Sequence, residues 1–170
     1  MSDPFSTLGV EPAFDLDLAV LERRHRELSR ELHPDRYVGR PAGERRQALG
    51  RAIEVNEAWR VLKDPIRRAE ALLTLSGTPV GETNEPKPDP ELLMDMMEQR
   101  ESLAEARQKR DPALLEKLAG TMRDRFQKTE QSLGTALAAK DAAAAVRQLG
   151  ELRYLRRFLD EAAAIEDEIF

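Results

Sequence analysis

The strongest constraint on the fold is a short stretch of sequence that is unsuited to helix. Residues 77–90 (GTPVGETNEPKPDP) contain two glycines and four prolines and hardly any apolar side chains. Proline removes a backbone donor and glycine lowers helix propensity, so this composition favours an extended connection. The stretch divides the 170-residue chain into two parts that can each hold a small core. We therefore predict a first domain over residues 1–76, a linker over 77–89 and a second domain over 90–170.

The spacing of apolar side chains predicts the class of fold on both sides of the linker. They recur three and four residues apart, and alternating strand patterns are missing, which indicates an all-α protein. In the first part we expect a turn-rich opening and three helices, over residues 4–10, 17–32, 44–63 and 65–75. In the second part, capping carboxylates at Asp89, Asp111 and Asp141 predict three long helices. Short connections imply antiparallel neighbours, so we expect a three-helix bundle or an extended helical hairpin with a returning third helix.

Composition limits the classes of function. The chain has no cysteine, so it offers no thiolate for a disulfide, a zinc ion or an iron-sulfur cluster, and we expect it to hold no metal and no cofactor. A formal net charge of -5 argues against a general nucleic-acid binder. Because the sequence has no apolar run of membrane-spanning length and no signal-like start, we expect a cytoplasmic protein that does not enter a membrane.

The helix expected over residues 17–32 has two contrasting faces. Its apolar face carries one histidine among leucines, at Leu18, Leu21, His25, Leu28 and Leu32. The opposite face carries Arg23, Arg26 and Arg30. Directly after it come His33, Pro34 and Asp35, where proline ends the helix and displays the imidazole and the carboxylate in a loop. A basic face on an isolated helix is more often only a solvated surface. The functional interpretation of these arginines therefore rests on the order of the basic helix, the HPD tripeptide and the elements that follow.

A basic helix, the HPD tripeptide, a polar loop and a second amphipathic helix together resemble the J domain, a helical hairpin with an HPD loop. The stretch VNEAWRVLKDPIRRAE at residues 55–70 is similar to that family's "LxDPxxR" region. The resemblance implies a docking module for a DnaK-type chaperone. It assigns the docking charges to Arg23, Arg26 and Arg30, and the trigger of the chaperone's ATPase to His33, Pro34 and Asp35.

The second part resembles one type of J protein. Residues 92–101 (LLMDMMEQRE) are similar to the "LMEQLELRE" region of HscB-type co-chaperones, and residues 151–155 (ELRYL) to their "KLRFL" stretch. The resemblance implies a surface that binds an iron-sulfur scaffold protein, formed by Leu93, Met94, Met97, Glu98, Glu101, Glu105 and Tyr154. Met97 and Tyr154 depart from the leucine and the phenylalanine familiar at these positions, and both keep the apolar bulk of the residue they replace.

Helical periodicity alone leaves the role of this surface undecided. It predicts a core stripe at Leu92, Met96, Gln99, Leu103 and Ala106. Leu93 and Met97 lie beside that stripe, where they either widen the core or face a partner.

The resemblance implies a co-chaperone that binds an IscU-type scaffold, delivers it to a DnaK/HscA-type chaperone and stimulates that chaperone's ATPase. The alternative is a J-domain co-chaperone that delivers a different client. An enzyme is not expected, because His25 and His33 are the only histidines and no cysteine is present. We expect His25 to be a hydrogen-bonded structural residue, and no nucleophile lies beside His33 and Asp35 in the sequence.

Overall fold

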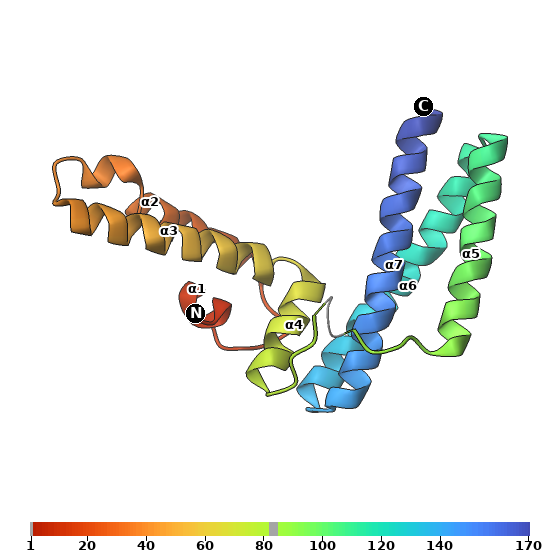
Figure 1. Cartoon of the computed structure of the whole chain (residues 1–170), viewed down its shortest axis with the longest axis horizontal. Helices are drawn as coiled ribbons and strands as arrows, with labels where there is room; N and C mark the ends of the chain where they lie inside the picture. The colour runs from red at the N-terminus through yellow and green to blue at the C-terminus, as the bar shows by residue number, and fades with distance from the viewer. Residues whose placement is uncertain (1, 82–84) are drawn as a thin grey trace. The chain divides into compact units, whose positions relative to one another are not determined.

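The computed structural model describes residues 2–81 and 85–170, so residues 82–84 of the predicted linker lie outside the described residues. Within the described part the chain forms seven α-helices and one 3-10 helix and no strand, which confirms the all-α prediction (Figure 1). The chain divides into two compact units, Met1–Pro79 and Val80–Phe170. No helix of the described residues has the length and apolar character needed to cross a membrane.

The first unit is built around an antiparallel helical hairpin. Its elements are α1, α2, the 3-10 helix η1, α3 and α4, which span Pro4–Leu8, Leu18–Glu31, Pro34–Tyr37, Ala42–Leu62 and Pro65–Leu75. The helices α2 and α3 lie side by side, and η1 belongs to the loop between them (Figure 1). The predicted helical hairpin with an HPD loop is therefore present.

The expected turn-rich opening is wrong in part, because it contains the short helix α1. Asp3 caps this helix by accepting the backbone N–H of Ser6 at 3.0 Å, and Gly9 ends it with a φ of 66°. Phe5 and Leu8 are fully buried from this one turn. Burial of these two side chains stabilises a helix that would be too short to form alone.

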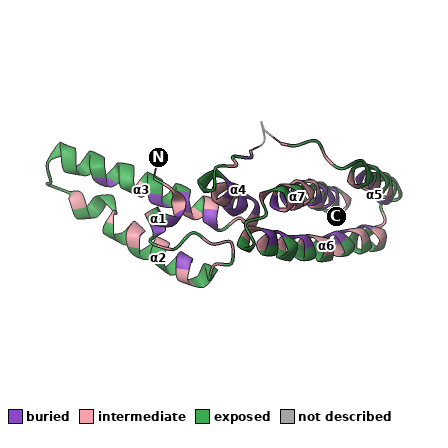
Figure 2. Ribbon diagram, turned by 90° about the horizontal axis from the view of Figure 1, so that it is seen from below, coloured by how far each residue is buried: buried purple, intermediate pink, exposed green. Residues whose placement is uncertain are grey.

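The core of the first unit lies where α1, α2 and α3 meet. It consists of Phe5, Leu8, Leu21, Val55, Ala58 and Leu62. Leu28 and Leu32 pack against this cluster while partly exposed, whereas Leu18, also predicted for the apolar face, is largely exposed. Figure 2 shows that buried stretches of ribbon are short in α2 and α3 and that much of both helices is exposed.

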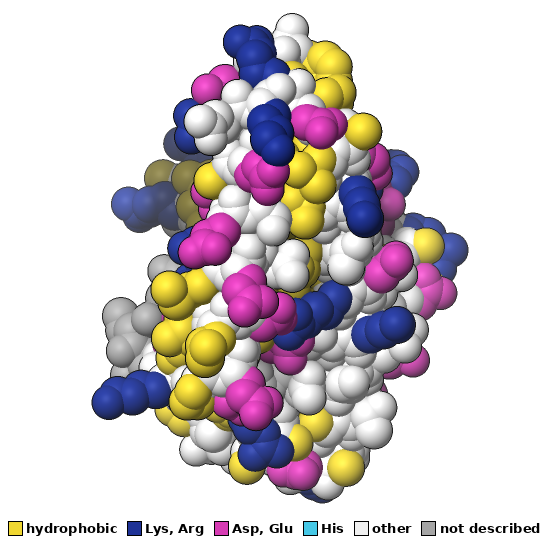
Figure 3. Space-filling view, turned by 90° about the vertical axis from the view of Figure 1, so that its right-hand side faces the viewer, with side chains coloured by type: hydrophobic (Ala, Val, Ile, Leu, Met, Phe, Trp, Pro, Cys, Tyr) yellow, Lys and Arg dark blue, Asp and Glu magenta, His cyan; other side chains and the backbone are white. Residues whose placement is uncertain are grey.

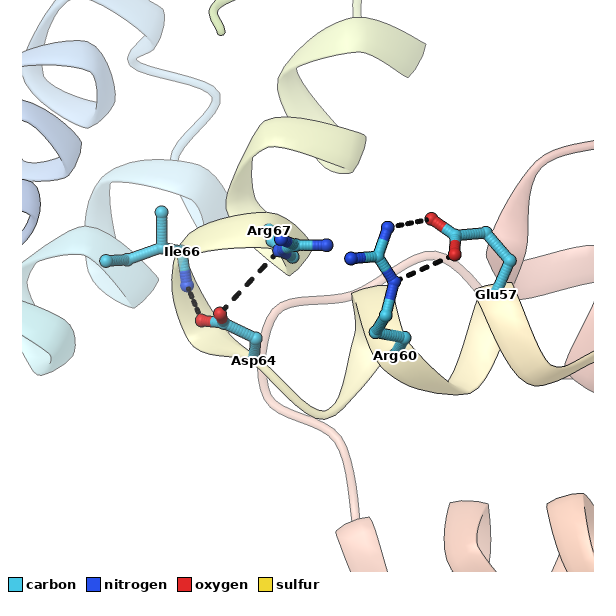
Figure 4. A network of polar contacts seen from close by, with 5 residues as sticks. All are labelled: Glu57, Arg60, Asp64, Ile66 and Arg67. Carbon is cyan, nitrogen blue, oxygen red and sulfur yellow. Dashed lines mark hydrogen bonds and ion pairs between the residues drawn. The ribbon is translucent and has the colours of Figure 1, made fainter. Parts of the chain in front are cut away.

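The corner between α3 and α4 is fixed by polar contacts (Figure 4). Asp64 caps α4 by accepting the Ile66 N–H at 3.0 Å, and its second oxygen lies 4.0 Å from Arg67. One turn earlier, Arg60 donates two hydrogen bonds to Glu57, at 2.6 and 2.8 Å. The hydrogen bonds from Arg60 lower the pKa of Glu57 and keep it ionised. With Asp64 as its cap, α4 therefore begins at Pro65, shortly after α3 ends at Leu62.

The second unit is the predicted three-helix bundle. Its helices α5, α6 and α7 span Pro90–Lys109, Pro112–Ala138 and Ala142–Ile169. Asp89, Asp111 and Asp141 each cap one of them by accepting a backbone N–H at 3.0 to 3.1 Å, which confirms the three start signals. The helices α6 and α7 form a long antiparallel pair against which α5 packs (Figure 1).

The bundle core collects apolar side chains from all three helices. The cluster to which all three helices contribute has the buried members Met96, Leu103, Ala106, Leu115, Ala119, Met122, Leu155, Phe158, Ala162 and Ile165. The stripe predicted for the first helix of this part is largely confirmed, because Met96, Leu103 and Ala106 are buried and Leu92 packs against the cluster. One face of α5 is thereby assigned to the core.

Part of the extended segment before α5 is attached to α7. Glu85 accepts a hydrogen bond from Nη2 of Arg157 at 3.2 Å, and its other oxygen lies 3.9 Å from Nη1 of Arg153. Sequence composition indicated an extended connection, and these contacts show that Glu85 belongs to the second unit.

Candidate functional site

The basic face of α2 is displayed to solvent. Asp17 caps the helix by accepting the Ala19 N–H at 3.0 Å. Arg23, Arg26 and Arg30 are all exposed, as an amphipathic helix with its other face on α3 requires. Arg26 pairs with Glu22 one turn earlier, at 2.8 Å. The three guanidinium groups are therefore available to a partner, and the pair with Glu22 is an exposed contact that contributes little stability.

Arg24 has a different task, which the sequence did not reveal. It donates from Nη1 to the backbone carbonyls of Gly9, at 2.7 Å, and Leu8, at 3.3 Å. These are carbonyls at the C-terminal end of α1, so Arg24 holds that helix against α2. Its position between the apolar face and the basic face is the only sequence signal that separates it from Arg23.

The HPD tripeptide forms a compact exposed turn rather than an open loop. His33 is extended, Pro34 begins η1, and Nδ1 of His33 accepts the backbone N–H of Asp35 at 3.3 Å. Nδ1 also lies 3.6 Å from the Asp35 carboxylate, and the two side chains are 59% and 88% exposed. Because Nδ1 accepts the backbone N–H, the neutral ring carries its proton on Nε2. The turn thus presents an N–H donor and a carboxylate acceptor to solvent.

His25 is a structural residue, as expected from its place on the apolar face. Its Nε2 donates to Oδ1 of Asn56 at 2.8 Å. Its ring stacks on Trp59 with centroids 5.5 Å apart and planes at 15°. These contacts join α2 to α3 and hold the hairpin that positions the HPD turn.

The apolar residues of α5 beside the core stripe face solvent. Leu93, Met94 and Met97 are 41%, 66% and 58% exposed. The interpretation that Leu93 and Met97 widen the core is therefore wrong. Glu98, Glu101 and Glu105 are exposed on the same helix. Figure 3, in which α5 faces the viewer, shows hydrophobic side chains gathered beside carboxylates. We call the exposed side chains of Leu93, Met94 and Met97 the α5 apolar patch.

Tyr154 lies on α7 and is half-buried. It packs against the same core cluster as Leu92, the cluster that includes Met96 of α5. The Arg157 guanidinium lies 5.3 Å from the centre of its ring, a cation-π contact. Arg157 is the residue that binds Glu85, so Tyr154 is linked through Arg157 to the segment before α5.

Three further residues near the α5 apolar patch were missed in the sequence. Arg125 of α6 contacts Asp95 of α5 and Glu151 of α7. The partners are 30 and 26 residues away along the chain, so no local pattern could reveal them.

Comparison with known proteins assigns each unit to a family. Residues 3–71 match the DnaJ domain, and residues 88–163 match a family described as the HSCB C-terminal oligomerisation domain. The chain is 36% identical over 169 residues to a co-chaperone protein HscB homolog of Shewanella baltica, with 97% of each chain covered. It is 36% identical over 164 residues to a homolog of the same name from Neisseria meningitidis, covering 96% of this chain and 99% of the other.

Solved structures of other proteins are similar to this chain over nearly its whole length. The chaperone HscB from Vibrio cholerae has a TM-score of 0.90 at 30% identity and covers 99% of this chain and 100% of its own. The human co-chaperone protein HscB also has a TM-score of 0.90, at 25% identity, with 98% of this chain and 83% of that chain covered. With a J-domain hairpin, an HPD turn and a matching second unit in one order, the chain belongs to the HscB family of J-domain co-chaperones.

Proposed function

We propose that this co-chaperone binds an IscU-type iron-sulfur scaffold protein, delivers it to a DnaK/HscA-type chaperone and stimulates that chaperone's ATPase. The observation that carries the proposal is the α5 apolar patch. Leu93, Met94 and Met97 are exposed on a helix whose neighbouring stripe is buried, so these side chains have no role in the bundle core. The proposed place of action is the cytoplasm.

The first unit supplies the chaperone contact in this proposal. Arg23, Arg26 and Arg30 form an exposed cationic face, which accelerates encounter with an acidic surface. The HPD turn then offers the Nε2–H of His33 as a donor and the Asp35 carboxylate as an acceptor, which suits charge-assisted hydrogen bonds of fixed direction. ATP hydrolysis takes place in the chaperone, and this chain contributes only the contact that triggers it.

The second unit supplies the scaffold contact. Leucine and methionine side chains of the α5 apolar patch can adapt to an apolar partner surface. Glu98, Glu101 and Glu105 extend along the same helix and favour basic residues at the edge of that partner surface. Tyr154 adds an aromatic ring on α7, a residue type enriched among binding hot spots.

The proposal is tested by truncating Leu93 and Met97 together to Ala and measuring affinity for purified scaffold by calorimetry. Loss of two central apolar anchors is expected to weaken binding by about 2 kcal/mol, or about 30-fold. Stimulation of the chaperone's basal ATPase should stay normal, and only the additional stimulation by delivered scaffold should disappear. Circular dichroism of the variant checks that the bundle is intact.

A matched control lies on α3, where Leu49 and Ile53 form another exposed apolar pair four residues apart. Truncating both to Ala removes similar exposed surface from the first unit and should leave scaffold affinity unchanged. If the folded Leu93 and Met97 variant binds the scaffold as tightly as the unmodified protein, the α5 apolar patch is not the scaffold site. The alternative of a different client is tested by pulling down partners of the unmodified protein from the native cytoplasm. Recovery of unrelated proteins in place of the scaffold would favour that alternative.

A further inference from the structure

The proposed scaffold surface comes from two helices that are distant in the chain. The α5 apolar patch lies in the first half of α5, whereas Tyr154 lies in the middle of α7. A partner that contacts both requires them at a fixed separation. The shape of the surface therefore depends on how the first half of α5 is held against the rest of the bundle.

Apolar packing alone holds this half of α5 weakly. In its first ten residues only Met96 is buried in the core, with Leu92 packed partly buried beside it. The second half has two buried residues, Leu103 and Ala106, and two ion pairs to α7, between Arg100 and Glu161 at 3.7 Å and between Arg107 and Glu168 at 2.9 Å. The half that carries the apolar patch needs another constraint.

Arg125 supplies that constraint from α6. Its Nη1 donates to the Asp95 carboxylate, and its Nε donates to Oε1 of Glu151 at 2.8 Å. Asp95 lies directly after Met94 in the patch, and Glu151 lies one turn before Tyr154. One guanidinium therefore joins α5 and α7 beside the two parts of the proposed surface.

The environment of Arg125 strengthens both contacts. Its side chain is only one-third exposed, so the ion pairs are less screened than those on the open surface. Burial lowers the pKa of the guanidinium, but the hydrogen bonds to Asp95 and Glu151 outweigh it and raise the pKa above its usual value. The planar fork of arginine can serve two carboxylates at once, which the single ammonium of lysine does with poorer geometry.

We infer that Arg125 is a positioning residue for scaffold recognition, which fixes the first half of α5 against α7 without being part of the proposed contact surface. The inference rests on the proposed function. Without the guanidinium, the carboxylates of Asp95 and Glu151 would be left near each other with no cation between them. Loss of this tie between α5 and α7, with repulsion between the two carboxylates added, would let the start of α5 move away from α7 and would separate the apolar patch from Tyr154.

The first measurement is scaffold affinity of Arg125→Gln, which removes the charge at similar side-chain length. Affinity should fall about tenfold, within the range by which residues outside a contact surface alter binding. Arg125→Lys, which restores the charge without the fork, should recover part of the loss. The matched control is Arg123→Gln on the same helix, because Arg123 pairs with Glu116 within α6 and should leave affinity unchanged.

The second measurement detects the geometry directly and without scaffold. The chain has no cysteine, so cysteines introduced at the exposed positions Glu91 of α5 and Arg147 of α7 can be labelled specifically with nitroxides. In the Arg125→Gln background the distance distribution between the labels should broaden or lengthen. It should stay narrow in the Arg123→Gln background. If Arg125 only added thermal stability, replacing it with Gln would lower the melting temperature and leave the label distances in the folded protein unchanged.

The outcomes separate this inference from the proposed function. If truncation of Leu93 and Met97 weakens binding while Arg125→Gln does not, the scaffold site stands and the positioning role is overturned. Weakened binding by Arg125→Gln with unchanged distances also overturns it, because Arg125 would then act by direct contact. Unchanged binding in all variants would remove the proposed site itself. If Arg125→Gln does not fold, Asp95→Ala removes one arm of the contact and takes its place in both measurements.

Discussion

The two histidines illustrate how environment decides the role of a residue. His25 stacks on Trp59 and bonds to Asn56, so its ring serves the hairpin. His33 lies in the exposed HPD turn, where Nδ1 of its ring accepts the Asp35 N–H and lies 3.6 Å from the Asp35 carboxylate. A substitution at His25 would therefore disturb the fold of the first unit, whereas one at His33 would disturb what the turn presents to a partner.

We predict that His33→Asn abolishes stimulation of the chaperone's ATPase while the fold is kept. Asparagine is a favoured capping residue whose Oδ1 can accept the Asp35 N–H in place of Nδ1, so the turn should remain. The Nε2–H donor is lost. A change in stability below about 0.5 kcal/mol is expected for such an exposed position. ATPase assays and thermal melts measure the two effects, and normal stimulation by the variant would exclude a role for the imidazole.

At the scale of elements, α2 shows how one helix divides its tasks among its faces. Leu21 is buried, Arg24 holds α1, and Arg23, Arg26 and Arg30 are exposed. The charges of the outer face stabilise nothing in the core. They can therefore be changed with little loss of fold, which makes their contribution to docking measurable.

We predict that reversing Arg26 and Arg30 together to Glu slows association with the chaperone, because long-range attraction governs the rate of encounter. Raised salt should weaken docking of the unmodified protein in the same way. The Arg26→Glu change also replaces the ion pair with Glu22 by a like-charge contact, which destabilises the helix by about 0.5 kcal/mol. Stopped-flow or surface-based kinetics would measure the rate, with circular dichroism as the check on folding.

The control for total charge is reversal of Lys117 and Lys128 to Glu, both exposed on α6 of the other unit. This pair changes the net charge of the chain by the same amount. If it slows docking as much as the α2 variant does, the effect comes from net charge and not from the basic face of α2.

At the scale of the whole molecule, each of the two units has its own apolar core. The proposed function needs both units on one chain, because one contacts the scaffold and the other contacts the chaperone. A covalent connection raises the effective concentration of the second contact to about millimolar for a short linker. Delivery is thus expected to depend on the connection and not only on the two surfaces.

We predict that residues 1–79 and residues 80–170, produced separately, each fold to helical structures. The first fragment should stimulate basal ATPase, and the second should bind the scaffold with unchanged affinity. A mixture of both at micromolar concentration should lack the additional stimulation by scaffold, since the tether is gone. Circular dichroism, calorimetry and ATPase assays test the three statements. Full scaffold-dependent stimulation by the mixture would show that the connection is dispensable.

Local rules in the sequence determined most of the helical framework. Asp89, Asp111 and Asp141 marked helix starts correctly, because capping acts over two or three residues. Pro34 marked the end of α2, because a proline disfavours the helical conformation in the residue before it. Family resemblance in the HPD stretch and in residues 92–101 pointed to the two candidate surfaces.

Tertiary structure alone decided features that depend on distant partners. The helix α1 forms because Phe5 and Leu8 are buried against α2 and α3. Leu93 and Met97 lie at the edge of a helical stripe, where a period of 3.6 residues is compatible with core or solvent, and packing placed them outside the core. Arg125 acquires its partners from two other helices. Such contacts are set by how helices pack, and this cannot be read from spacing along one helix.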